Sequence, residues 1–268
     1  DIFADYTPLI EPLSLDEAYL DVTDHLWPGQ TATQVAREIR ARIREATALT
    51  ASAGVSYNKF LAKLASDQNK PDGLCVITPD RGPDFVLALP VGKFHGIGPA
   101  TAGKMRAMGI ETGADLRAQD LDFLTRRFGK SGRYYWNISR GIDHRQVRSD
   151  RIRKSVGAEN TYFTDLMDLA QAHDALAPLA GKVWRHVSRH GLRGRTVTLK
   201  VKFSDFQQIT RARTLPRAVG SEAEMLSIAR ELAGAVLPDP RGARLLGITL
   251  SGFDRDEDSD PVQLNLFG

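Results

Sequence analysis

The sequence has little cysteine and no long apolar run. Its single cysteine, Cys75, excludes an internal disulfide and is typical of a protein that folds in a reducing compartment. No apolar stretch approaches the roughly 18 residues that a membrane-spanning helix needs, and the N-terminus lacks the basic and apolar regions of a secretory signal. We therefore expect a cytoplasmic protein that contacts no membrane, with Cys75 packed as a small hydrophobic residue.

Chain length and charge distribution predict several domains. A chain of 268 residues exceeds the usual size of a single core, so we expect two or three compact units. Residues 1–150 contain 19 basic and 19 acidic residues, residues 151–253 contain 16 and 9, and residues 254–268 contain 1 and 5. A basic domain beside neutral ones is typical of a module that binds a polyanion, although a solvated arginine-rich surface would carry the same charge.

Apolar periodicity predicts an α+β fold with three regions of different pattern. The first region is βαβ-like, the second is all-helical over residues 78–148, and the third is a small α/β sandwich. In the first region we expect two short strands within 12–23 that meet near Asp16 and Glu17, a helix over 33–49, a strand over 50–55, a helix over 57–67 with Ser56 as its N-cap, and a strand over 74–77. In the third we expect an extended segment over 151–160, a helix over 165–189, a strand over 196–203, a helix over 221–236 and a strand over 245–253.

Two adjacent carboxylates, Asp16 and Glu17, lie between apolar residues in the segment LSLDEAYLD. Carboxylate oxygens are the ligands that Mg²⁺ prefers, and one or two of them combine with substrate phosphates in phosphoryl-transfer sites. A pair of Mg²⁺ ions held in this way can activate a 3′-hydroxyl and steady a leaving pyrophosphate. By itself an Asp-Glu pair is more often a surface feature.

The helical region contains the segment HGIGPATAGKM, followed by a second Gly-Ile at 109–110. This spacing resembles a helix-hairpin-helix, in which glycines allow close backbone approach and a helix N-terminus offers N–H groups to a DNA phosphate. The candidate DNA-binding residues are Gly96, Ile97, Gly98, Thr101 and Lys104. A glycine-rich helical corner without a ligand is the alternative.

Lysines are spaced along the predicted helix that follows Ser56. Lys59 and Lys63 share one face at i,i+4 spacing, and Lys70 follows the helix end, where it could contact a triphosphate. Solvated lysines with no ligand would produce the same pattern, and for the lysines considered alone we favour that interpretation.

Four blocks of sequence together resemble one family. YTPLIEPLSLDEAYLDVT, TASAGVSYNKFLAKLASDQNKPDGLCVI, GIGPATAGKMRAMGI and RKSVGAENT are similar, in the same order, to the bacterial DNA polymerase IV group of Y-family translesion polymerases. The resemblance implies low-fidelity, template-directed synthesis past lesions from dNTPs, with two Mg²⁺ ions. It divides the chain into part of a palm (1–78), a thumb with the helix-hairpin-helix (79–148), a linker (149–152), a DNA-clamping little finger (153–253) and a tail (254–268).

The resemblance also implies roles for individual residues. Asp16 and Glu17 would be catalytic metal ligands, and Lys70 would bind the triphosphate. Ser14, which precedes the pair, is assigned to packing. Arg153 and Lys154 in the fourth block would contact DNA, and primer–template DNA and dNTP would be the partners of a monomer.

The tail ends in QLNLF, which resembles the peptide that docks bacterial polymerases on the sliding clamp. Its apolar anchors and amide follow an acidic linker, and such tethering raises the effective concentration at the primer end. The candidate clamp-binding residues are Gln263, Leu264, Leu266 and Phe267. A frayed apolar terminus is the alternative.

The family's first metal-binding aspartate and its steric gate are not found in this chain, which begins at Asp1. We therefore expect an N-terminally truncated chain that is inactive by itself. A non-catalytic, DNA-binding accessory protein that docks on the clamp is the alternative, and a helix-hairpin-helix nuclease or ligase module is a further one.

Overall fold

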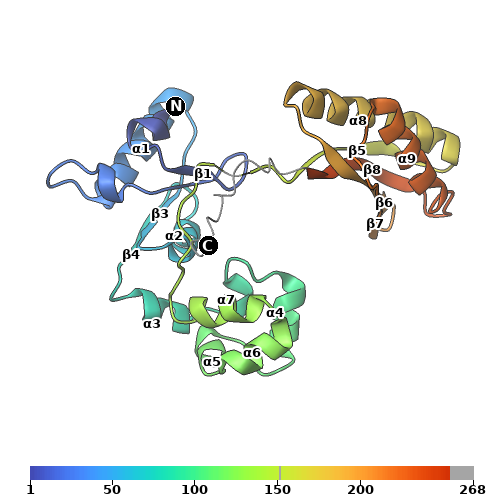
Figure 1. The fold of residues 1–268 in the computed structure, drawn as a ribbon. Helices are drawn as coiled ribbons and strands as arrows, with labels where there is room; N and C mark the ends of the chain where they lie inside the picture. Colours follow the sequence, from blue (N-terminus) through green and yellow to red (C-terminus); the bar gives the residue numbers. More distant parts are fainter. Residues whose placement is uncertain (151, 254–268) are drawn as a thin grey trace, which may run out of the picture. The chain divides into compact units, whose positions relative to one another are not determined.

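The computed structural model describes residues 1–150 and 152–253, which fold as two compact units, one on each side of this division (Figure 1). No helix among the described residues is long and apolar enough to cross a membrane.

The first unit begins with a hairpin and a βαβ motif. The hairpin strands are antiparallel, with Glu11 opposite Tyr19, and the two strands of the βαβ motif are parallel, with Val55 opposite Val76. The elements are η1 (Ile2–Asp5), β1 (Ile10–Pro12), β2 (Ala18–Leu20), η2 (Thr23–His25), α1 (Ala32–Thr47), β3 (Ala53–Ser56), α2 (Lys59–Gln68) and β4 (Leu74–Ile77).

Helix α2 is the element that fixes this region. Asn58 caps it by accepting a hydrogen bond from the Leu61 N–H at 3.0 Å. Phe60, Leu61 and Leu64 on its inner face are buried, which holds the helix against the β3–β4 pair and leaves its other face for charged side chains.

Short helices form the rest of the first unit: α3 (Gly82–Leu87), η3 (Val91–Lys93), α4 (Pro99–Arg106), α5 (Gly113–Arg117), α6 (Leu121–Phe128) and α7 (Ser131–Ile138). Side chains such as Thr112 and Asp120 cap these helices. Their apolar faces join α2 in one buried cluster, in which the rings of Phe60 and Phe94 lie 5.6 Å apart. The helical region and the βαβ motif therefore share a core.

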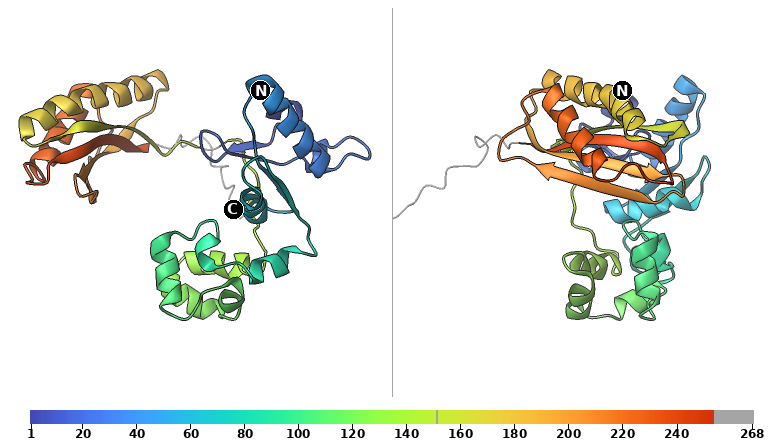
Figure 2. Two further views of the ribbon diagram at one scale, coloured as in Figure 1. Left: turned by 180° about the vertical axis from the view of Figure 1, so that it is seen from behind. Right: turned by 90° about the vertical axis from the view of Figure 1, so that its right-hand side faces the viewer.

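The second unit is an antiparallel sheet of strand order β5-β8-β6-β7, with two helices on one face (Figure 2). Burial alternates along β6, where Val197, Leu199 and Val201 face the helices. Among residues 152–253, no helix covers the opposite face. The elements are β5 (Ser155–Leu166), α8 (Leu169–Arg189), β6 (Gly194–Phe203), β7 (Gln208–Thr214), α9 (Glu222–Gly234) and β8 (Ala243–Phe253).

The structure confirms the α+β fold class and differs from the sequence expectations in several details. β1 lies almost wholly before the predicted range 12–23, and β5 continues to Leu166, so α8 begins at Leu169 and not at residue 165. The strand β7 was not predicted, because its polar residues lack a buried alternation. Ser56 does not cap α2; its hydroxyl donates to the Ile77 carbonyl at 2.8 Å, and Asn58 provides the cap. The domain boundaries within the first unit remain a prediction.

Candidate functional site

The predicted carboxylate pair lies in the turn between β1 and β2. The N–H groups of Leu13 and Ser14 donate to the Glu17 carbonyl at 2.8 and 3.2 Å, which closes the turn. The Ser14 hydroxyl donates to Asp16 Oδ1 at 2.7 Å. Our assignment of Ser14 to packing is therefore wrong: its side chain is exposed and orients the neighbouring carboxylate.

Two lysines lie beside Glu17: Lys63 in α2, and Lys70, which follows the end of this helix. Lys63 Nζ lies 3.0 Å from Glu17 Oε1 and 3.2 Å from Asp67 Oδ2. Lys70 Nζ lies 3.9 Å from Glu17 Oε1 and 2.8 Å from Asp67 Oδ1. The hydrogen bond to Asp67 is the main cause that raises the pKa of Lys70, so its ammonium remains fully charged at neutral pH. The structure thus places the Lys70 ammonium near the Glu17 carboxylate, and the roles of the two residues remain predictions.

Lys59 has a different surrounding from Lys63. Its ammonium is buried, lies 2.6 Å from Glu11 Oε2, donates to the Gln146 carbonyl and covers the Tyr19 ring at 5.0 Å. The interpretation of these helix lysines as solvated is therefore wrong: Lys59 joins the hairpin to the segment after α7, and Lys63 is held by carboxylates.

The predicted helix-hairpin-helix lies at the start of α4. Gly96 has a φ of +93°, a conformation that favours glycine, and Ile97 is buried. Gly98 is the N-cap residue of α4 and has open space where a Cβ would lie. The exposed N–H groups here could meet a phosphate. The Lys104 ammonium donates to the Arg127 carbonyl and lies over the Phe128 ring at 4.8 Å, so it is tied to α6.

The sheet of the second unit presents a polar face opposite its helices. The strand register places the threonines and lysines of β6 on this face, next to serine and threonine of β8. Arg153 and Lys154, the other predicted DNA contacts, are exposed just before β5. The residues on this face that the sequence analysis missed include Thr196, Thr198, Lys200, Lys202, Thr210, Thr214, Thr249, Ser251 and the acidic Glu159, whose Oε2 lies 2.7 Å from Lys200 Nζ. The alternation of Thr and Lys along β6 was the available signal.

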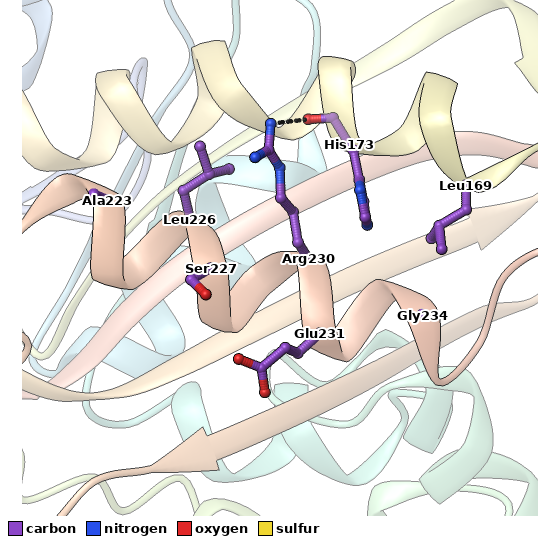
Figure 3. A pocket seen from close by; sticks show the side chains of 8 residues that line it. All are labelled: Leu169, His173, Ala223, Leu226, Ser227, Arg230, Glu231 and Gly234. Atoms are coloured by element: carbon purple, nitrogen blue, oxygen red, sulfur yellow. Dashed lines mark hydrogen bonds between the residues drawn. The ribbon is translucent and has the colours of Figure 1, made fainter.

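A cavity of about 480 Å³ opens between α8 and α9, on the helical face of the second unit (Figure 3). Arg230 reaches across it and donates to the His173 carbonyl at 3.4 Å. This cavity lies on the opposite side of the sheet from the polar face, and none of the predicted DNA-binding residues lines it. Gln263, Leu264, Leu266 and Phe267 lie outside the described residues.

Family models match three parts of the chain. The impB/mucB/samB family matches residues 1–67, the helix-hairpin-helix motif of the same family matches residues 79–110, and the family's C-terminal domain matches residues 153–266. DNA polymerase IV of Gluconobacter oxydans is 60% identical over 99% of this chain and 75% of its own length. DNA polymerase IV 2 of Agrobacterium fabrum is 58% identical over the same shares.

Solved structures have the same fold. A Y-family DNA polymerase chimera matches with a TM-score of 0.82 and 26% identity, over 94% of this chain and 73% of its own. An insertion ternary complex of the Dbh DNA polymerase matches with a TM-score of 0.58 and 25% identity, over the same shares. These matches assign the chain, with its βαβ motif, helical region and second-unit sheet, to the class of Y-family DNA-directed DNA polymerases. Within that class, the chain belongs to the bacterial DNA polymerase IV family.

Proposed function

We propose that this chain takes part in template-directed DNA synthesis past lesions, by transfer of a nucleotide from a dNTP to a primer 3′-hydroxyl. The observation that carries the proposal is the turn that presents Asp16 and Glu17 beside the Lys70 ammonium. Carboxylates can bind the metal ions that such a reaction needs, and the ammonium can bind the triphosphate.

The residues fit part of a divalent-metal site. Asp16 is exposed and its side chain offers hard oxygen ligands, which suit Mg²⁺. When bound, two Mg²⁺ ions would lower the pKa of the primer hydroxyl and stabilise charge on the pyrophosphate. Within this chain, Asp16 and Glu17 would hold the ions, Ser14 would orient Asp16, and Lys70 would bind the triphosphate.

We further propose that a polypeptide limited to residues 1–268 does not extend a primer. In the described residues, no group of three or more His, Cys, Asp or Glu side chains is placed to hold a metal ion. Asp16 and Glu17 would then need at least one further ligand. Such a polypeptide would behave as the DNA-binding accessory protein considered as the alternative.

DNA would contact two regions in this proposal. The backbone at Gly96 and Gly98 would bind a phosphate without reading sequence. Arg153, Lys154 and the polar face of the second unit would bind the duplex backbone, since residues 151–253 carry an excess of positive charge.

The proposal includes a clamp-docking tail and a monomeric polymerase. Gln263, Leu264, Leu266 and Phe267 would bind the bacterial sliding clamp. Replacement of both Leu266 and Phe267 by alanine should abolish clamp binding in a pull-down with purified clamp while DNA binding persists. Retained clamp binding would contradict this part of the proposal.

Single-nucleotide incorporation tests the main proposal. The polypeptide of the complete reading frame should add the base complementary to the template, only when Mg²⁺ is present. An accessory protein would bind the same primer–template without adding a nucleotide. Addition that ignores the template base, or absence of addition by the complete polypeptide, would contradict the proposal.

A further inference from the structure

Four charged side chains form a continuous network at the end of α2: Glu17, Lys63, Asp67 and Lys70. The network contains the proposed catalytic carboxylate and the proposed triphosphate lysine. Lys63 and Asp67 connect Glu17 to Lys70.

Lys63 is placed rigidly. Only 13% of its side chain is exposed, and the neighbouring residues Leu64 and Phe60 anchor α2 in the core. Asp67, one helical turn later, holds the same ammonium at 3.2 Å. A lysine fixed by helix packing and by a carboxylate loses little further conformational entropy when it binds a second carboxylate.

Glu17 is placed less rigidly by its own element. It ends a turn between two three-residue strands, and such a short hairpin is not stable by itself. Within residues 1–150, the side-chain contacts of Glu17 are with Lys63 and Lys70, and both involve Oε1. Oε2 accepts no hydrogen bond from these residues.

We propose that Lys63 is a positioning residue for nucleotidyl transfer: it holds Glu17 through Oε1, while Asp67 holds the Lys70 ammonium beside Glu17 before the nucleotide binds. Oε2 is then the oxygen available to the reaction. Lys70, about half exposed, is free to move from Asp67 to the triphosphate, whereas Lys63 stays in place. The inference rests on the proposed function.

Steady-state incorporation kinetics on the complete polypeptide test this assignment. Lys63→Met should lower kcat about 10- to 100-fold, since a misplacement of 1 Å can cost that much. The KM for dNTP should change less than about threefold, because Lys63 does not contact the nucleotide. Lys63→Arg, which keeps the charge, should restore most of kcat. Lys70→Met should instead raise KM for dNTP about tenfold or more.

Equilibrium dNTP binding to the polymerase on a dideoxy-terminated primer gives a readout that does not depend on catalysis. Lys63→Met should leave the Kd unchanged, and Lys70→Met should raise it. Arg37→Met, which removes an exposed cation from the outer face of α1, is the control for charge loss and should change neither kcat nor Kd. The thermal unfolding midpoint of each variant checks folding, and Asp67→Asn replaces Lys63→Met if the latter does not fold.

Three results would overturn the positioning role: an unchanged kcat in Lys63→Met, a Lys63→Arg variant as slow as Lys63→Met, or a dNTP Kd that rises as it does in Lys70→Met. The last would make Lys63 a triphosphate ligand. A wild-type polypeptide that adds no nucleotide would contradict the proposed function instead, so the two failures are distinguishable.

Discussion

Single side chains join the hairpin to the rest of the first unit. Glu11 Oε2 accepts hydrogen bonds from the Lys59 ammonium at 2.6 Å and from the Arg148 N–H at 2.8 Å. Burial disfavours the charged form of Glu11, but these donors outweigh it and lower its pKa. The hairpin that presents Asp16 and Glu17 therefore depends on a largely buried ion pair.

Glu11→Gln should lower the free energy of unfolding by about 2–3 kcal/mol, because it leaves the buried Lys59 ammonium without a carboxylate. Urea unfolding of the chain measures this change. Arg42→Met, which breaks the exposed pair with Asp5, is the matched control and should cost less than about 1 kcal/mol. Equal effects of the two substitutions would show that the Glu11–Lys59 pair is no more important than a surface pair.

The same pair gives a pH dependence. The folded-state pKa of Glu11 lies below its usual value, so its contribution to stability is full above the unfolded-state pKa and is lost as pH falls through the folded-state pKa. The stability difference between wild type and Glu11→Gln should therefore be constant near neutral pH and shrink below about pH 4.5. Urea unfolding at several pH values measures it; a difference that grows in acid would contradict the assignment.

Ser14 illustrates a residue whose role depends on the turn. Ser14→Ala removes the hydrogen bond to Asp16 from an exposed site, so it should change the free energy of unfolding by less than about 0.5 kcal/mol. It should lower kcat about 5- to 10-fold, which corresponds to the roughly 1 kcal/mol that a typical hydrogen bond contributes. A Ser14→Ala polymerase with normal kcat would exclude this positioning role.

At the scale of elements, β3 and α2 lie so close that a side chain at Gly54 is excluded. A Cβ there would lie 2.0 Å from the Ala62 carbonyl oxygen. Gly54→Ala should destabilise the chain by about 3 kcal/mol in urea unfolding, because backbone must move. Gly103→Ala, at an open helical position, should be neutral or stabilising. A tolerated Gly54→Ala would contradict this packing.

A substitution at the start of α4 should change DNA affinity without changing stability. Gly98 has open space and a negative φ of −75°, so Gly98→Ala should retain the thermal unfolding midpoint. Its new methyl group would lie where a phosphate approaches, and DNA affinity should fall about five- to tenfold. Gly103→Ala again serves as the control, with unchanged affinity. Fluorescence anisotropy with labelled duplex measures both, and equal affinities would exclude the proposed phosphate contact.

Regular elements could be predicted from the sequence where apolar periodicity is strong. The helices that became α8 and α9 were predicted because their apolar residues recur at helical spacing, and the strand over 74–77 because it is a short apolar run that follows a turn. The charged network around Glu17 could not be predicted, because nothing in the sequence shows that Asp67 lies near the turn that contains Glu17. The alternation of Thr and Lys along β6 indicated one polar strand face, but the residues beside it could not be predicted without the register of β6 with β7 and β8.

Across the described residues, positive charge is concentrated in the second unit, which has its own core. The polar face of its sheet carries Lys202 and also Lys200, which pairs with Glu159. Lys202→Met should reduce the slope of log K against log salt for duplex binding by about 1, as expected for one lost phosphate contact. Lys182→Met on the exposed side of α8 should leave the slope unchanged. Identical slopes in wild type and both variants would exclude Lys202 from the DNA-binding surface.

The most direct test of Asp16 as a metal ligand compares Asp16→Asn with wild type in the complete polypeptide, by single-nucleotide incorporation and by DNA binding. We expect a loss of rate of more than about a hundredfold, because a metal ligand is worth several kcal/mol in the transition state, with unchanged DNA affinity. Asp24→Asn, at an exposed position in η2, controls for the loss of a carboxylate and should keep full activity. Full activity in Asp16→Asn would contradict the assignment of this turn as the catalytic site.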